Sequence, residues 1–283
     1  MPATAAVQTM TIGDVRVTYL PDGETRLAPT AFFPASTDEG WALHPEWLDE
    51  EGRLLCSIGG FLLQSGDRTV LVDTGFGPRH VEFPGFGPFD GGRLLESLAQ
   101  AVVQPGDIDT VVYTHLHLDH ANASVRRDGD AWSLAFPNAR FLIRQSEWNQ
   151  WAGKNDPAGI YQETEEAIRD RVELFDSDRA IAPGVSVMST PGHTPGHNSI
   201  VISSGPERAI ILGDVVHCPV QLEEEEWGCV FDVDAALARS TRDKLLAELE
   251  GSGTVVAGGH FTDFSFGRIM RGEGRRLWTV EKT

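Results

Sequence analysis

Cysteine is scarce in this sequence: the 283 residues include only Cys56, Cys218 and Cys229, and none of them stands in CxxC spacing. Disulfide frameworks and thiolate zinc sites both need paired or closely spaced cysteines. The sequence therefore argues against both and favours a reducing, cytoplasmic location. The stretch "MPATAAVQTM" at the N-terminus agrees, because it lacks the basic segment and the apolar core of a signal peptide.

Basic residues are also few, with 23 lysines and arginines against 42 aspartates and glutamates and a formal net charge of −19. Such a chain should repel a phosphate backbone, so we expect no nucleic-acid partner. The longest charged run, the glutamates at 223–226, is interpreted as a solvated loop. Apolar runs are short, and none approaches the roughly 18 residues of a membrane-spanning helix. We therefore expect no membrane partner.

Apolar runs of strand length recur in both halves of the chain, separated by segments with helical spacing. Continuous runs such as "DTVVYT" predict strands that are covered on both faces. The succession predicts a layered α/β fold with two central sheets, and the lack of a repeat or clear linker predicts one domain over residues 1–283. The predicted strands are 14–20, 60–66, 68–75, 109–114, 139–145, 184–193, 197–205, 208–214, 254–260 and a hairpin at 266–280, and the predicted helices include 92–103 and 232–253.

Two long segments do not follow this pattern. Residues 28–55 are irregular and aromatic, with Phe32, Phe33, Trp41 and Trp47. Long loops of this kind are often lids or binding loops, and the equal alternative is a surface strap or an exposed dimer contact. Residues 76–91 are rich in glycine, proline and phenylalanine, and either line the entrance to a site or serve packing alone.

The strongest local signal is the stretch "VVYTHLHLDH", which places His115, His117, Asp119 and His120 directly behind an apolar run. His115 and His117 are two positions apart, so their side chains point the same way in an extended chain. Four donors from one loop cannot all bind a single small cation together with water and other ligands. The spacing therefore predicts two metal ions side by side.

Further donors stand at other predicted strand ends. "TPGHTPGH" supplies His193, "IILGD" supplies Asp214, and "VVAGGH" supplies His260. Donors on the carboxyl ends of strands are expected where α/β folds build their sites. Each of these motifs also carries a small residue beside its donor, and Gly192, Gly213 and Gly259 should let the backbone and a metal approach each other closely. Nitrogen and carboxylate donors without thiolate suit two zinc ions, with manganese, iron and cobalt as alternatives.

Taken together, HxHxDH, the PGH turn and the LGD and GGH strand ends resemble the metallo-β-lactamase-fold hydrolase superfamily, over nearly the whole chain. The resemblance implies a four-layer αββα sandwich, with two mixed sheets flanked by helices and the site at one edge. It implies a bridging role for Asp214 and an outer role for Asp73, which would orient the ligand loop. The implied ligands are His115, His117 and His193 for one metal and Asp119, His120 and His260 for the other.

The remaining histidines are judged by their positions. His197 should be structural rather than a ligand, and His44 and His80 should serve packing or the surface. His217 stands three positions after Asp214, where this chain departs from the tyrosine that similar homoserine-lactone lactonases carry. It could touch substrate or donate a proton. Cys218 beside it should be a small buried residue.

The resemblance implies a hydrolase in which two cations deprotonate a bridging water, and the hydroxide attacks an electrophilic carbon or phosphorus. We expect it to open a lactone or cleave a small carboxylic ester, with catalytic roles for Asp119, Asp214 and His217. The later segments, such as "LGDVVHCPVQL", resemble the branch of lactonases and methyl-parathion-hydrolase-like phosphotriesterases. A phosphotriesterase-like hydrolase is therefore the alternative, and a noncatalytic metal-stabilised binding protein is a third. Similar proteins are often dimers, which implies a homodimer for this chain.

Overall fold

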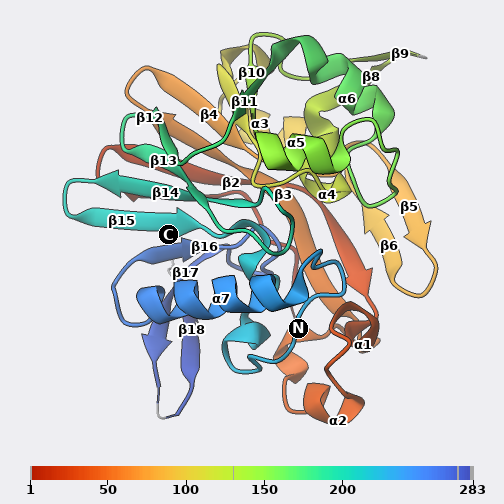
Figure 1. The fold of residues 1–283 in the computed structure, drawn as a ribbon, viewed down its shortest axis with the longest axis vertical. Helices are drawn as coiled ribbons and strands as arrows, with labels where there is room; N and C mark the ends of the chain where they lie inside the picture. Colours follow the sequence, from red (N-terminus) through yellow and green to blue (C-terminus); the bar gives the residue numbers. More distant parts are fainter. Residues whose placement is uncertain (1, 130, 273, 281–283) are drawn as a thin grey trace.

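Two large mixed sheets form the centre of the computed structural model, which describes residues 2–129, 131–272 and 274–280. Among these residues the first sheet has nine strands, in the order β11-β10-β7-β4-β3-β2-β6-β5 with β1 beside β2 (Figure 1). Its strands are β1 (Gln8–Ile12), β2 (Val15–Leu27), β3 (Leu54–Ser65), β4 (Arg68–Val72), β5 (His80–Phe83), β6 (Gly87–Asp90), β7 (Thr110–Val112), β10 (Arg140–Arg144) and β11 (Val172–Phe175).

The second sheet has seven strands in the described part of the chain, in the sequence order β12 to β18. Its strands are β12 (Arg179–Ala182), β13 (Val185–Ser189), β14 (Asn198–Ser204), β15 (Glu207–Ile211), β16 (Val255–Ala257), β17 (Phe266–Arg271) and β18 (Arg276–Val280). Only β15 and β16 pair in parallel within it. A separate hairpin joins β8 (Val125–Asp128) to β9 (Ala131–Leu134).

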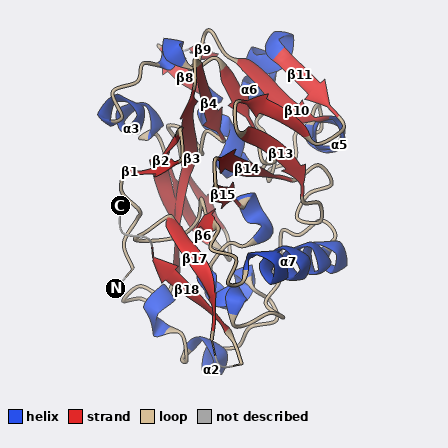
Figure 2. Ribbon diagram, turned by 90° about the vertical axis from the view of Figure 1, so that its left-hand side faces the viewer, coloured by secondary structure: helices blue, strands red, loops and turns tan. Residues whose placement is uncertain are grey.

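Helices cover the outer faces of both sheets. The helices of the described residues are α1 (Pro29–Phe32), α2 (Asp38–Trp41), α3 (Leu94–Gln100), α4 (Leu118–Ala121), α5 (Gln145–Trp151), α6 (Gln162–Ile168) and α7 (Ala235–Leu249). Figure 2 shows α7 standing out on the opposite side of the molecule from α3. None of the helices among the described residues is both long enough and apolar enough to cross a membrane.

The layers follow from strands that bury side chains on both faces. Val112 belongs to the apolar cluster between the sheets, whereas Val111 belongs to the cluster beneath α3. In the second sheet Ile211 faces the first sheet, and Ile210 packs with Leu246 of α7. Because successive side chains of a strand point to opposite faces, a continuous apolar run is what a strand covered on both sides requires. The predicted four-layer αββα sandwich is confirmed.

The N-terminal strands differ from the prediction. The strand predicted at 14–20 is β2, which continues to Leu27 through a register shift between Pro21 and Gly23, and β1 was missed. The letters Pro-Asp-Gly usually signal a turn. Here they form a β-bulge, in which Asp22 is completely buried. Tertiary partners for the Asp22 carboxylate therefore decide the local structure.

The aromatic segment at 28–55 contains α1, α2 and a 3₁₀ turn, and β3 begins at its end. Of the readings of this segment, the exposed aromatic contact does not hold for Phe32, Phe33 and Trp41, which are buried. Trp41 packs on Trp227, with 4.7 Å between ring centroids. Because these rings are already buried within the chain, their apolar area is not available to a second copy. A dimer contact built on them would have needed that area. The homodimer itself stays a prediction.

Asp22 ties three segments together. Its Oδ2 accepts hydrogen bonds from the backbone N–H groups of Phe76 and Gly77, both at 2.8 Å. Its Oδ1 accepts from Gly92 at 2.9 Å and from Leu94 at 3.0 Å. One buried carboxylate thus holds the turn after β4, the end of the β5–β6 hairpin and the start of α3 against the bulge in β2.

We predict that Asp22→Asn lowers the free energy of unfolding by about 2–4 kcal/mol, because an amide NH₂ would face N–H donors that a carboxylate now accepts. Urea denaturation would measure the change. Asp67→Asn is the matched control, since the Asp67 side chain is 93% exposed and should change stability by no more than about 0.5 kcal/mol. Equal stability of the two variants would contradict the role given to Asp22.

Candidate metal centre

The loop that follows β7 is fixed by Asp73, at the end of β4. Asp73 Oδ1 accepts the backbone N–H of Thr114, and Oδ2 accepts the Thr114 hydroxyl, both at 2.7 Å. Oδ2 also lies 2.9 Å from Nδ1 of His120. Asp73 has a φ of +56°, a conformation that few residues other than glycine adopt. The prediction that Asp73 orients the ligand loop is confirmed.

Glu147 of α5 supports the same loop from the other side, and sequence reasoning did not find it. Its buried carboxylate accepts the Leu116 N–H at 2.9 Å, the Thr194 hydroxyl at 2.7 Å and the Gly196 N–H at 3.0 Å. It therefore joins the HxHxDH loop to the PGH turn. Burial raises the pKa of this carboxyl. Nothing in the sequence near Glu147 signals this role, which depends on two distant loops meeting.

His197 is structural, as predicted. Its Nε2 accepts the backbone N–H of Asp214 at 2.9 Å, and its Nδ1 lies 2.9 Å from the Thr190 hydroxyl. Gly213 lies so close to His197 that a Cβ there would come within 2.6 Å of the His197 ring. A Cβ at Gly259 would meet nothing of the described chain nearer than 4.0 Å, and the approach of a metal to these glycines stays a prediction.

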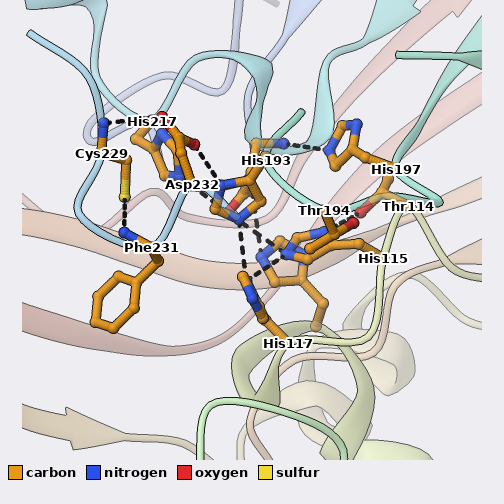
Figure 3. A network of polar contacts seen from close by, with 12 residues as sticks. Thr114, His115, His117, His193, Thr194, His197, His217, Cys229, Phe231 and Asp232 are labelled. Atoms are coloured by element: carbon orange, nitrogen blue, oxygen red, sulfur yellow. Dashed lines mark hydrogen bonds and ion pairs between the residues drawn. The ribbon is translucent and has the colours of Figure 1, made fainter. Parts of the chain in front are cut away.

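The seven predicted ligands come together in two adjoining groups. Ligand atoms of His115, His117, His193 and Asp214 lie within 4.8 Å of one another, as do those of Asp119, His120 and His260. Figure 3 shows the rings of the first group converging from separate loops. In that group His117 Nδ1 lies 3.1 Å from His115 Nε2 and 3.0 Å from His193 Nε2. In the second, the Nε2 atoms of His120 and His260 are 3.1 Å apart.

Asp214 lies between the two groups. Its Oδ2 faces the first group, 3.4 Å from His193 Nε2 and 3.7 Å from His115 Nε2. Its Oδ1 faces the second, 3.3 Å from the Nε2 atoms of both His120 and His260. Burial opposes the charge of this carboxylate, but the surrounding histidines lower its pKa well below the usual value.

The protonation of the histidines differs between the groups. Burial lowers the pKa of His115, His117 and His193 well below 6.5, so these rings are neutral. Burial also disfavours charge on His120 and His260, but the carboxylates of Asp214 and Asp119 outweigh it. The pKa of His120 is thereby raised well above 6.5, and that of His260 is raised as well.

The donor set fits metal ions. Asp214 Oδ1 is buried and has no hydrogen-bond partner among the described residues, although two ring nitrogens lie nearby. Neutral imidazole offers one lone pair and one N–H. Where several lone pairs are aimed at a common point, a cation bound at that point satisfies them all. Imidazole and carboxylate without thiolate suit zinc. The ligand roles of the individual residues stay predictions.

His217 faces the same cluster. Its Nε2 lies 3.2 Å from Asp214 Oδ2, and neither ring nitrogen makes a hydrogen bond within the described chain. His193, His217 and Cys229 form a further group with ligand atoms within 4.8 Å, but this group shares His193. Cys218 next to His217 is buried, as predicted, and burial raises the pKa of its thiol to about 12.

The other two histidines do not reach the cluster. His44 is buried against Trp227, 3.0 Å from Glu224, and His80 is exposed beside Asp90. Both therefore have the packing and surface roles that were predicted.

An apolar cavity of about 170 Å³ adjoins the cluster. Phenylalanines from three segments line it: Phe32 of α1, Phe83, Phe86 and Phe89 of the β5–β6 hairpin, and Phe231 of the loop before α7. Both readings of residues 76–91 have support, because they contribute Phe83, Phe86 and Phe89 to the cavity and also pack in an apolar cluster. They form a hairpin rather than an irregular loop. No lysine or arginine of the described residues lines this cavity.

Comparison with known proteins agrees with this geometry. Residues 60–260, well over half of the chain, match the Metallo-beta-lactamase superfamily. The N-acyl homoserine lactonase AiiA of Bacillus thuringiensis subsp. kurstaki is 26% identical over 217 residues, which are 70% of this chain and 80% of the relative.

Solved structures share the fold over almost the whole length. AidC, a dizinc quorum-quenching lactonase, superimposes with a TM-score of 0.83 at 22% identity, covering 99% of this chain and 98% of that chain. AbOPH, a hydrolase in the beta lactamase superfamily, has a TM-score of 0.82 at 26% identity, covering 99% of both chains. The chain therefore belongs to the metallo-beta-lactamase superfamily, as its motifs predicted, and is a hydrolase of that fold related to the N-acyl homoserine lactonases.

Proposed function

We propose that this chain is a dinuclear zinc hydrolase that opens a lactone or cleaves a small carboxylic ester with an apolar acyl or aryl group. The observation that carries the proposal is Asp214, whose two oxygens face two separate groups of histidines beside an apolar cavity. One zinc ion would be held by His115, His117 and His193, and the other by Asp119, His120 and His260, with Asp214 shared. The two ions would supply hydroxide from a bridging water and polarise the substrate carbonyl.

The cavity supports a neutral substrate. Its walls are phenylalanine, leucine and other uncharged side chains, and the titratable groups on it other than Cys56 are the cluster residues and His217. Away from the cluster, a charged group on the substrate would meet no lysine or arginine of the described chain, and desolvating an unpaired charge is costly. Apolar acyl chains and aromatic rings gain free energy in such a cavity by leaving water.

Two side chains are proposed to act on the substrate. Asp119 is the more exposed carboxylate of the cluster, at 15% against 6% for Asp214, and both line the cavity. We propose that Asp119 takes a proton from the attacking water and passes it to the leaving alkoxide. We propose that His217 donates a hydrogen bond to the substrate's oxygen, because its ring nitrogens make no hydrogen bond to the described residues. Its ring lies edge-on to that of Phe32, with 5.3 Å between the centroids.

The segment at 28–55 is proposed to serve as a wall of the cavity. Phe32 lines the cavity and its carbonyl accepts the Val230 N–H at 2.9 Å. At the other end the Ala28 N–H donates to the Phe86 carbonyl at 2.8 Å. These contacts join the segment to both of the other phenylalanine-bearing segments, which favours the binding role over that of a dimer contact.

A phosphotriesterase-like hydrolase is the second candidate. It is favoured by His217, which stands where similar lactonases carry a tyrosine, and by an aromatic cavity that would also suit the aryl leaving group of an organophosphate. The same metals and the same Asp119 would serve either reaction, so substrate preference separates the two.

We predict that the zinc-loaded protein hydrolyses lactones or aryl esters, and that Asp119→Asn lowers this activity at least about a hundredfold. A pH-indicator assay with N-acyl homoserine lactones, simple γ-lactones, aryl esters and paraoxon would measure it, with Asp67→Asn as the control. If no lactone or ester is hydrolysed, the proposal is refuted. Hydrolysis of paraoxon alone would establish the second candidate.

We predict that His217→Phe lowers kcat/KM by about 10–100-fold, the effect of losing one hydrogen bond to a charged group, and leaves the zinc content unchanged. Steady-state kinetics and metal analysis would test this together. Cys218→Ala at the adjacent buried position should retain activity, because its thiol has no part in the chemistry. A loss of zinc in His217→Phe would instead make His217 a ligand.

We predict that acidification removes zinc first from the group containing His120 and His260. Protonated imidazole cannot bind a metal, and these two rings have raised pKa values, so protons compete with zinc already above pH 6.5. The lowered pKa values of His115, His117 and His193 delay competition to below 6.5. Zinc bound per chain, measured against a chelator over a pH series, should fall in two steps; a single step would contradict this order.

A further inference from the structure

Asp232 makes a direct contact with one of the predicted ligands, and neither the motifs nor the proposed chemistry uses it. Its Oδ1 lies 2.8 Å from Nδ1 of His193, as Figure 3 shows. The Asp232 side chain is only 2% exposed, and its Oδ2 accepts the backbone N–H of Cys229 at 3.1 Å. Both oxygens of this buried carboxylate therefore have fixed partners.

This contact decides which ring nitrogen of His193 carries the proton. A carboxylate can only accept, so Nδ1 of the neutral ring is the N–H and Nε2 keeps its lone pair. Nε2 is the atom that faces the cluster, 3.0 Å from His117 Nδ1 and 3.4 Å from Asp214 Oδ2. Without Asp232 the ring could rotate or adopt the other tautomer, and either change would turn the lone pair away.

The backbone beside Asp232 is also hydrogen-bonded to the segment that carries His193. The Val233 N–H donates to the carbonyl of His193 at 2.9 Å, and the Asp234 N–H donates to that of Gly192 at 3.0 Å. Phe231, the residue before Asp232, lines the apolar cavity. One short loop thus carries part of the substrate wall and the support of a metal ligand.

The other group of ligands has supports of its own. Nδ1 of His120 lies 2.9 Å from Asp73, and Nδ1 of His260 lies 2.8 Å from the carbonyl of Ser57. Removing Asp232 would leave both contacts in place. The effect of the loss should therefore be confined to the group that contains His193.

We propose that Asp232 is a positioning residue that holds Nε2 of His193 toward the cluster and selectively sets the metal affinity of the group formed by His115, His117 and His193. The inference rests on the proposed two-metal centre and adds a residue that controls one half of it. Outer carboxylates of this kind typically contribute about 10–100-fold to metal affinity.

The experiment compares the full-length parent protein with Asp232→Ala, Asp232→Asn and Asp234→Asn. Zinc affinity for each equivalent would be measured by competition with a chromophoric chelator, and cobalt(II) absorption would report the ligand geometry. Asp232→Ala should weaken one zinc equivalent about 10–100-fold and leave the other unchanged. Asp232→Asn should lie between, because its amide oxygen still accepts from Nδ1 but carries no charge.

Asp234→Asn is the matched control. Asp234 is exposed on the same loop and caps α7 by accepting the Leu237 N–H at 2.9 Å. Asparagine caps a helix as well as aspartate does, so this variant changes the same charge without loss of structure and should bind zinc like the parent. Thermal unfolding of the metal-free variants would confirm that each is folded.

A double variant shows which of the two zinc ions is weakened. In His260→Ala only the His193 group keeps its full ligand set, so adding Asp232→Ala to that variant tests the zinc of the His193 group alone. The remaining zinc of the double variant should be weakened by the same factor. Unchanged affinity in Asp232→Ala, equal weakening of both equivalents, or the same effect in Asp234→Asn would overturn the inference. A parent that binds one zinc would refute the dinuclear function, and the inference would then survive only if Asp232→Ala weakened that zinc at least tenfold.

Discussion

The constraint on which the rest of the structure depends is that many ring nitrogens and carboxylate oxygens converge on one buried centre, where each of them needs a partner. Ring nitrogens of His117 and its neighbours lie about 3 Å apart in a site that water barely reaches. In a medium of low dielectric constant such an arrangement persists only if a cation occupies the centre or if the surrounding protein holds each ring in place. In this fold the surrounding protein holds each ring in place, and the centre is thereby ready to bind a cation.

Buried carboxylates outside the cluster hold its parts in place. Asp73 fixes the start of the HxHxDH loop and His120, Glu147 joins that loop to the PGH turn, and Asp232 fixes His193. Each contacts two or more groups, at least one of them far away in the sequence, and each is largely buried. Asp22 does the same for the hairpin that bears the phenylalanines. The candidate metal centre and the apolar cavity are thus held by the same kind of interaction.

The arrangement also bears on the proposed substrate, because the wall of the cavity away from the cluster is apolar. Phenylalanine side chains from α1, the β5–β6 hairpin and the loop before α7 give an apolar surface, and the charged groups that border it belong to the cluster. A substrate would therefore be oriented by placing its one polar group at the cluster and its apolar part against the rings. The high negative charge of the chain as a whole, −19, is consistent with a neutral substrate.

The sequence by itself determined the layered fold and the set of predicted ligands, because both are encoded locally: short apolar runs specify strands buried on both faces, and HxHxDH, PGH, LGD and GGH each stand directly behind such a run. It did not reveal β1, the bulge at Asp22 or the burial of Phe32 and Trp41. Only the tertiary structure brought Glu147 and Asp232 to the ligand loops, aimed the two oxygens of Asp214 at different groups, and closed an apolar cavity from three distant segments. The physical reason is that a carboxylate's partner, and the side of a ring that a cavity exposes, depend on contacts between segments that no local pattern of residues records.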